Sequence, residues 1–142
     1  MMEKQNLFGF SVEVDADATR GWYAKTEEWG CTCTSCRNFI ALARKRMLPD
    51  PVLDTLDSLG LPPEKVTYVC ELTRDGPRHC YEFSYRIAGS ILSGDETASV
   101  SLGWGSVLCF HEPYPYGAPH FPKPHFDLDF SITLPWVLDE PE

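Results

Sequence analysis

The chain has 142 residues, of which 43% are apolar and 13% aromatic, and its formal net charge at pH 7 is -9. This length and apolar content predict one folded domain with a sizeable core, and they exclude a disordered binding segment. The excess of acidic groups lies after residue 50, where five basic and fourteen acidic side chains occur. That charge disfavours nonspecific binding to nucleic acids or anionic membranes. It either serves solubility or suits a basic protein partner.

The N-terminal segment 1–6 has no basic stretch followed by an apolar core, so no secretory signal is predicted. No stretch approaches the roughly 20 apolar residues that a membrane-spanning helix requires. We therefore expect a cytoplasmic protein. In that compartment the six cysteines are expected to be thiols or metal ligands rather than disulfides.

The first expected elements are strands. Residues 7–15 alternate between apolar and polar side chains, which predicts a half-buried strand. The stretch 15–21 predicts a turn, and 21–26 predicts a short partner strand. Together they suggest an N-terminal hairpin.

Two helices are expected next. Apolar residues at helical spacing predict a helix over 35–47, for which Thr34 or Ser35 is available as the N-cap. A second helix is predicted over 50–60, with Asp50 as its N-cap and a glycine at its end.

The remaining chain is predicted to be β-structure. Strands over 66–72 and 79–88 flank a turn signal at 74–77, and 97–110 forms a further apolar stretch. The last strand, 125–134, alternates most regularly along the chain. Its apolar side chains are expected to point inward, while Asp127 and Asp129 are expected on a solvated face.

About six strands, with a helical pair over 35–60 inserted after the second one, predict a single α+β domain spanning residues 1–142. The sheet should be mainly antiparallel. One of its faces should be covered by the helices, or the sheet should curl into a sandwich.

Three cysteines, Cys31, Cys33 and Cys36, occur within six residues just before the first predicted helix. This spacing resembles half of a zinc site, because a C-x-x-C pair where a loop meets a helix is a common source of two thiolate ligands. A fourth ligand would have to come from a distant residue, and the candidates are Cys70, His79, Cys80, Cys109, His111, His120 and His125.

Two other interpretations of the cluster stay open. Free cysteine packs like a small apolar residue, and Cys36 falls on the apolar stripe of its helix, so the thiols can be purely structural. Alternatively, Cys31 or Cys33 ahead of a helix N-terminus would have a lowered thiol pKa and suit redox chemistry. The chain lacks the alternating β-α-β pattern of thioredoxin-like folds.

The cysteine segment continues into Arg37, Asn38 and Phe39, and the chain later contains Leu59-Gly60 before a strand and a terminal Leu-Pro-Trp at 134–136. With these features the chain resembles a group of small uncharacterised bacterial proteins that carry a C-x-C-x-x-C-x-N-F signature. The resemblance implies a stand-alone cytosolic protein. It implies no activity and no functional residues.

A second candidate site is the segment 111–125, which is rich in proline, histidine and aromatic residues. A connection of this length is either packed onto the body of the domain or functional. Tyrosine and proline make a semi-rigid surface suited to recognition of proteins or sugars. The binding residues that we predict there are Tyr114, Tyr116, His120 and Phe121.

No glycine-rich phosphate loop, G-x-S-x-G motif or H-E-x-x-H motif occurs in the chain. We therefore predict a non-catalytic protein-interaction module with a cysteine-rich structural loop, stabilised by zinc in the metal interpretation. The alternative function is a thiol oxidoreductase or redox sensor that uses the cysteine cluster. A third possibility is a small-ligand or sugar binder, which would require a concave pocket lined by Trp22, Trp104 or Trp136.

Overall fold

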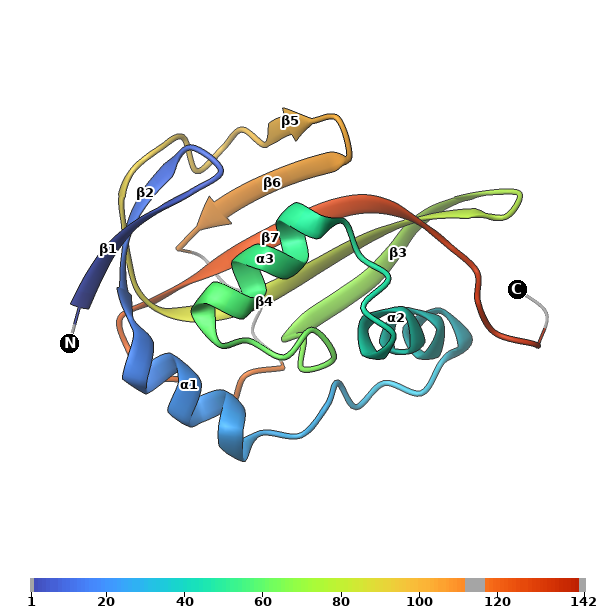
Figure 1. Cartoon of the computed structure of the whole chain (residues 1–142), viewed down its shortest axis with the longest axis horizontal. Helices are drawn as coiled ribbons and strands as arrows, with labels where there is room; N and C mark the ends of the chain where they lie inside the picture. Colours follow the sequence, from blue (N-terminus) through green and yellow to red (C-terminus); the bar gives the residue numbers. More distant parts are fainter. Residues whose placement is uncertain (1, 112–116, 141–142) are drawn as a thin grey trace.

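The computed structural model describes residues 2–111 and 117–140 of the chain (Figure 1). Within these residues the helices are α1 (Ala16–Lys25), α2 (Thr34–Arg44) and α3 (Asp50–Leu59). The strands are β1 (Met2–Leu7), β2 (Phe10–Asp15), β3 (Tyr68–Asp75), β4 (Arg78–Ser93), β5 (Val100–Leu102), β6 (Gly105–Phe110) and β7 (His125–Pro135). No helix among the described residues combines the length and the apolar character needed to cross a membrane.

The seven strands are linked by hydrogen bonds into one antiparallel sheet with the order β1-β2-β4-β7-β6-β5, and β3 also pairs with β4. The 16-residue strand β4 is the centre of this arrangement. One of its edges pairs with β3 near its start and with β2 near its end, while its other edge pairs with β7. The predicted α+β class with a mainly antiparallel sheet is therefore confirmed.

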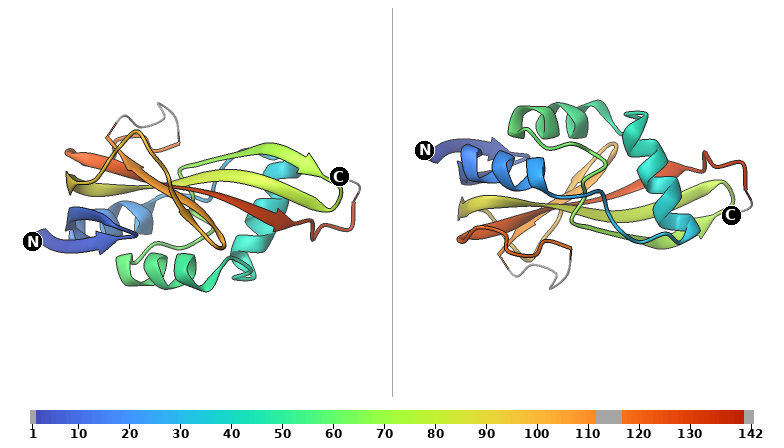
Figure 2. Two further views of the ribbon diagram at one scale, coloured as in Figure 1. Left: turned by 90° about the horizontal axis from the view of Figure 1, so that it is seen from above. Right: turned by 90° about the horizontal axis from the view of Figure 1, so that it is seen from below.

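The helices α2 and α3 lie on the same side of the sheet in the two edge-on views of Figure 2. Phe39 of α2 is completely buried and meets the ring of Phe83 of β4 at a centroid distance of 4.7 Å. Phe83 in turn meets Phe130 of β7 at 5.3 Å. The core therefore lies between these helices and the face of the sheet that carries the alternate apolar residues of β4 and β7.

The strand predicted over 7–15 is present only from Phe10 to Asp15, as β2, because Leu7 ends β1 and the next two residues form the turn of a two-stranded hairpin. Phe8 and Gly9 both have positive φ, at 54° and 100°, as the two-residue turns that suit a twisted hairpin require. The side chain of Asn6 accepts a hydrogen bond from the Gly9 amide at 3.0 Å. The alternation of apolar residues could not reveal this turn, since the turn itself contains a phenylalanine.

The turn and strand predicted over 15–26 are instead the helix α1. Asp15 caps this helix by accepting a hydrogen bond from the Ala18 amide at 3.0 Å. Only Thr19 and Tyr23 of the helix are fully buried. Because the buried face is so narrow, the apolar pattern gave little sign of a helix. The connection between β2 and β3 thus contains three helices, where a pair was expected.

The helices expected over 35–47 and 50–60 are present as α2 and α3, but α2 ends at Arg44, and each helix begins at an expected cap residue, so that its actual cap lies one residue earlier. Cys33 is the N-cap of α2, and Pro49 is the N-cap of α3, with Asp50 in the first turn. Gly60 ends α3 in the left-handed conformation, with φ 73°, as the sequence suggests.

Two corrections concern the later strands. The apolar stretch 97–110 is divided into β5 and β6 by a turn at Gly103 and Trp104. The strand expected over 125–134 is β7, but Asp127 and Asp129 do not form a solvated face, since they are 1% and 5% exposed. Their carboxylates instead meet Arg86 and Ser84 of the neighbouring strand β4.

Candidate metal centre and adjoining pocket

The three clustered cysteines lie where the loop between α1 and α2 enters the α2 helix. Cys33 is the N-cap residue, and its sulfur accepts a hydrogen bond from the Cys36 amide at 3.4 Å. Cysteine here takes the place of the oxygen-bearing residues that usually cap helices. The cap therefore bends the chain so that the sulfur atoms of the loop and of the first helical turn approach one another.

The sulfur atoms of Cys31, Cys33 and Cys36 all lie within 4.8 Å of one another. Those of Cys31 and Cys33 are 3.4 Å apart. Cys31 and Cys33 are exposed, while Cys36 is buried and its sulfur accepts a hydrogen bond from Trp29 Nε1 at 3.4 Å. The predicted metal ligands are thus brought together, with two residues open to solvent and one fixed against the domain.

The pKa values of two of the three thiols are shifted in opposite directions. Burial raises the pKa of the Cys36 thiol well above its usual range. The pKa of Cys31 is lowered, mainly by a backbone hydrogen bond from Cys33 and then by side-chain hydrogen bonds from Cys36 and Cys33. Cys31 is therefore the more readily ionised of these two, and Cys36 needs a bound cation to lose its proton near pH 7.

The start of α2 is held to the sheet by a chain of polar contacts. Ser35 Oγ donates to Glu71 of β3 at 2.6 Å, and Tyr81 of β4 donates to the Ser35 carbonyl at 2.8 Å. Glu71 also meets Nδ1 of the buried His79 at 3.2 Å. Burial opposes ionisation of Glu71, but hydrogen bonds from Ser35, His79 and Arg74 outweigh it and lower its pKa. These contacts give the cysteine cluster a rigid base.

Asn38, the asparagine of the C-x-C-x-x-C-x-N-F segment, fastens the C-terminal end of β7 and the residues after it to α2. Its side chain is completely buried and donates to the Pro135 carbonyl at 3.1 Å and to the Tyr81 hydroxyl at 3.2 Å. Its Oδ1 accepts a hydrogen bond from the Val137 amide at 2.7 Å. Asn38 and the buried Phe39 therefore anchor the helix that presents Cys36.

The structure does not bring a fourth sequence-predicted ligand to the cluster within the described residues, because the group of neighbouring donors there contains only the three cysteines. His79 is engaged with Glu71, and His111 Nδ1 meets Glu96 at 2.9 Å. Cys109 lies in the core with no exposed surface. In the part of the chain that the structure describes, the cluster is therefore a group of three thiols.

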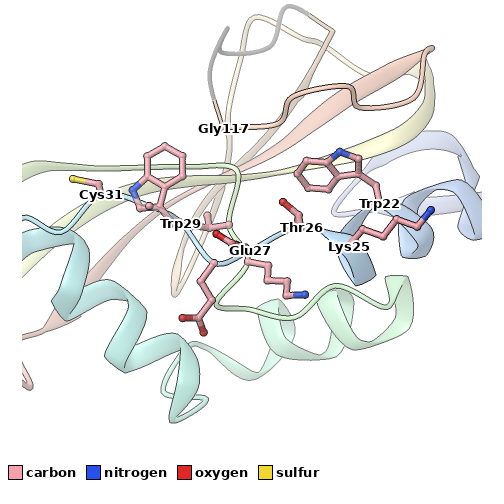
Figure 3. A pocket seen from close by; sticks show the side chains of 11 residues that line it. Trp22, Lys25, Thr26, Glu27, Trp29, Cys31 and Gly117 are labelled. Atoms are coloured by element: carbon pink, nitrogen blue, oxygen red, sulfur yellow. The ribbon is translucent and has the colours of Figure 1, made fainter.

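A pocket of about 600 Å³ lies beside the cysteine loop, between the end of α1 and the segment around residue 66. In the view of Figure 3, Trp22 and Trp29 stand on either side of it and Cys31 lies at its far end. Among the residues that the structure describes, the lining consists of Trp22, Lys25, Thr26, Glu27, Glu28, Trp29, Gly30, Cys31, Lys65, Val66 and Gly117. Trp22 is therefore the one of the three tryptophans Trp22, Trp104 and Trp136 that lines this pocket.

The predicted binding residues of the 111–125 segment have different surroundings. Tyr114 and Tyr116 lie outside the described residues. His120 is exposed and has a positive φ of 60°. Phe121 is 6% exposed, and its ring packs against Trp22 at a centroid distance of 4.9 Å. Phe121 thus stands behind a wall of the pocket.

Apart from Trp22 and Cys31, the residues that line the pocket were not identified from the sequence. Trp29 follows two glutamates in a segment without periodicity, and Lys65 comes from the distant turn before β3. Lys65 lines the pocket, and its Nζ donates to the Tyr23 carbonyl of α1 at 2.7 Å. Only the proximity of Trp29 to Cys31 in the sequence could have suggested a link between the tryptophan and the cysteine cluster.

A second polar cluster, also missed, is buried on the face of the sheet opposite Phe83. Arg86 Nε of β4 contacts Asp127 Oδ1 of β7 at 3.0 Å, with side-chain exposures of 7% and 1%. Ser84 Oγ donates to Asp129 Oδ1. Burial, followed by a hydrogen bond with the Glu82 carboxyl, raises the pKa of Asp129 to about 9. Asp129 is consequently protonated near pH 7.

Comparison of the chain with models of protein families, with curated proteins and with solved structures found no match in any of the three searches.

Proposed function

We propose that this protein is a non-catalytic interaction module whose cysteine loop, Cys31 to Cys36, binds one zinc ion. The observation that supports the proposal best is the approach of three thiol sulfurs to within 4.8 Å of one another at the N-terminus of a helix. Zinc is bound by thiolates at about 2.3 Å, so sulfurs that share one ion must be clustered in this way.

The donor set fits a soft divalent cation. Thiolates favour zinc over calcium or magnesium, which prefer oxygen ligands. Cys31 ionises readily, and the ion itself would remove the proton of the buried Cys36, because a coordinating thiol is deprotonated. Binding should therefore release protons and weaken as the pH falls.

Zinc held by these three cysteines would have a fourth position at the exposed side of the loop. A closed structural site has four protein ligands, whereas an open position is occupied by water or by another molecule. A side chain of a bound partner is a suitable fourth ligand, since Cys31 and Cys33 are solvent-exposed. The net charge of -9 favours a basic partner.

Metal content of untagged, reduced protein after incubation with zinc and desalting tests the proposal. We expect one zinc ion per chain in the parent protein, and loss of that ion in the triple variant Cys31→Ser, Cys33→Ser, Cys36→Ser. Replacement of zinc by cobalt gives a spectroscopic measure of the number of sulfur ligands, because thiolate-to-cobalt charge transfer grows with each thiolate.

The matched control is the variant in which the other three cysteines, Cys70, Cys80 and Cys109, are replaced by serine or, for the buried Cys109, by alanine. It should retain one zinc ion. A parent protein that retains no metal while all six thiols are reduced and the domain is folded would contradict the proposal.

A second function, a thiol-based redox sensor, is favoured by the contact of 3.4 Å between the sulfurs of Cys31 and Cys33. The Cys31 thiolate would attack oxidised glutathione, form a mixed disulfide and release one glutathione thiolate. Cys33 would then attack the Cys31 sulfur, close an intramolecular disulfide and release the second glutathione. The two protein thiols are oxidised and the glutathione disulfide is reduced.

The redox function is tested by incubating metal-free protein with oxidised glutathione and mapping its disulfides by peptide mass spectrometry. If this function holds, we expect the Cys31–Cys33 disulfide to form at the redox potentials that glutathione maintains in the cytosol. Protection of both thiols by zinc under the same conditions would favour the metal function, since a bound thiolate is less available for exchange.

A further inference from the structure

The pocket beside the cysteine loop, here named the two-tryptophan pocket, has walls from three separate parts of the chain. α1 and the following loop contribute Trp22 and Trp29, the segment before β3 contributes Lys65 and Val66, and the segment before β7 contributes Gly117. Its volume of about 600 Å³ lies within the range of pockets that hold small organic ligands. The volume alone does not select a ligand, so the chemistry of the walls has to do so.

Both indole rings are held in place by hydrogen bonds from their N–H groups. Trp22 Nε1 donates to the Pro119 carbonyl at 3.0 Å, and its ring packs on Tyr23 and Phe121 at centroid distances of 5.0 and 4.9 Å. Trp29 Nε1 donates to Cys36 Sγ at 3.4 Å. Because each N–H already has a partner, the rings offer stacking surface rather than hydrogen bonds.

The wall next to Trp29 is built by a close approach of backbone. Gly117 has φ +95°, and a Cβ atom placed on it would lie 1.9 Å from the Thr67 carbonyl oxygen and 2.8 Å from Trp29 Cζ3. Only glycine fits this position, so the wall and the Trp29 ring are in direct contact. The pocket is therefore formed in advance of ligand binding, which lowers the entropy cost of binding.

The charged groups of the lining are balanced. Within the described part of the chain, the basic residues of the lining are Lys25 and Lys65, and the acidic residues are Glu27 and Glu28. Arg44 also contacts Glu28, and its hydrogen bond lowers the pKa of that carboxyl, which stays ionised. A charged ligand would meet a group of its own sign whichever charge it carried. An uncharged ligand with many hydroxyls can use the ammonium groups as donors and the carboxylates as acceptors.

We propose that the two-tryptophan pocket binds a neutral pyranose sugar. Its C–H face would stack on the fixed indole rings, and its hydroxyls would bond to the Lys, Glu and Thr side chains around them. A flat aromatic ligand would use the same rings, but it would cover these polar groups without pairing them, which costs binding energy. The pocket adjoins the cysteine loop, since Cys31 is part of its lining and Trp29 is hydrogen-bonded to Cys36, but the proposed sugar contacts involve no sulfur atom.

Saturation-transfer NMR on the reduced, full-length protein tests the proposal without a labelled ligand. The probes are glucose, galactose, mannose, N-acetylglucosamine, maltose and cellobiose. Glucosamine and N-acetylneuraminic acid serve as a cationic and an anionic comparison. We expect transfer to the ring protons of at least one neutral sugar, and weaker transfer to both charged sugars.

Two variants locate the site. Trp22→Phe keeps an aromatic ring against Phe121, and we expect it to weaken binding of the neutral sugar by about fivefold through lost stacking area. Lys25→Ala changes only an exposed side chain, and it should also weaken binding. The matched control, Trp104→Phe, alters a half-buried tryptophan outside the pocket and should leave binding unchanged.

The proposal is overturned if no neutral sugar gives a signal, if a charged sugar binds more tightly than every neutral one, or if Trp22→Phe and Trp104→Phe bind equally well. Repeating the titration with zinc-loaded and zinc-free protein separates the two proposals, because Trp22 and the polar side chains of the pocket have no contact with the cysteines among the described residues. The sugar should bind to both samples, and any difference in affinity between them reports on the contact of Trp29 with Cys36. A folded protein that binds zinc but no sugar would refute the sugar site alone.

Discussion

The cysteine loop and the buried polar cluster of β4 and β7 are both gatherings of reactive side chains, but they are built in opposite ways. The three cysteines of the loop lie within six residues of sequence, and two of them are exposed. In the buried cluster, Arg86 and Asp127 are 41 residues apart, and Ser84 and Asp129 are 45 apart. The first cluster is local and accessible, while the second exists only in the folded sheet.

This difference determines what each cluster can do. Exposed thiols can exchange protons, metals or disulfide partners without any change in the core. A buried ion pair cannot lose one member without leaving a charge in a medium of low polarity. We therefore expect changes in the buried cluster to act on stability and changes in the loop to act on ligand binding.

The largest effect should be the pH dependence that Asp129 introduces. The pKa of its carboxyl is raised from the ordinary value of 3.8 to about 9 in the folded chain, so the native state binds a proton that the unfolded chain has released. This contribution to stability is fully present below pH 4 and is lost as the pH rises through about 9, by at most about 1.4 kcal/mol per pH unit.

Urea unfolding of the parent protein and of Asp129→Asn at several pH values checks this prediction. The variant has no titrating group there, so its free energy of unfolding should rise relative to that of the parent with increasing pH. Parallel pH profiles for the two proteins would show that Asp129 has an ordinary pKa.

Asp127→Ala should lower the free energy of unfolding by about 3–5 kcal/mol, since it removes the carboxylate that contacts the buried Arg86 guanidinium. The matched control is Asp57→Ala, which removes an exposed carboxylate from Arg46 at 2.6 Å. An exposed pair contributes about 1 kcal/mol or less. Similar effects of the two substitutions in urea unfolding would mean that burial of the Arg86 pair carries no cost.

If the cysteine loop binds zinc as proposed, removal of that ion should have a smaller effect on stability. A ligand present at a hundred times its dissociation constant adds about 2.7 kcal/mol. The change should be visible in tryptophan fluorescence, because Trp29 Nε1 is hydrogen-bonded to Cys36 Sγ. Trp29→Phe is the control variant and should lose that response to a chelator. A drop in stability as large as that of Asp127→Ala would mean that the loop supports the core as well.

The smallest effect on stability, but a clear chemical one, should come from alkylation of the metal-free protein. Cys31 is exposed and its pKa is lowered, so it should react first with iodoacetamide at pH 7. Cys109 is buried and its pKa is raised to about 12, so it should react at least about a hundredfold more slowly. Peptide mass spectrometry at timed intervals measures both rates. Equal rates would contradict the difference in accessibility between loop and sheet.

The N-terminal region shows why part of the fold could not be predicted. The apolar alternation over 7–15 is real, but a pair of residues with positive φ interrupts it at Phe8 and Gly9. The helix α1 buries only Thr19 and Tyr23, and both reach partners on β4. Thr19 Oγ1 accepts from the Ala88 amide at 3.1 Å, and Tyr23 donates to the Arg86 carbonyl at 2.7 Å. Those contacts are tertiary, so local periodicity could not report them.

The candidate sites divide in the same way. The cysteine cluster could be named in advance, since adjacent residues and a helix cap bring its sulfurs together. The two-tryptophan pocket could be stated only as a condition on Trp22, because its other walls come from Lys65 and Gly117, far along the chain. The burial of Asp127 and Asp129 was missed because outward positions on a strand are solvated unless another element covers them.

By itself, the sequence determined the α+β class, the positions of α2, α3 and β7, and the grouping of Cys31, Cys33 and Cys36. Each of these depends on residues within one or two turns or on strict alternation, which short-range physics specifies. Tertiary contacts were needed to reveal the helix α1, the two-tryptophan pocket and the buried Arg86–Asp127 pair. These depend on which distant strands meet and on what their contacts exclude from water, and neither is encoded in any single segment.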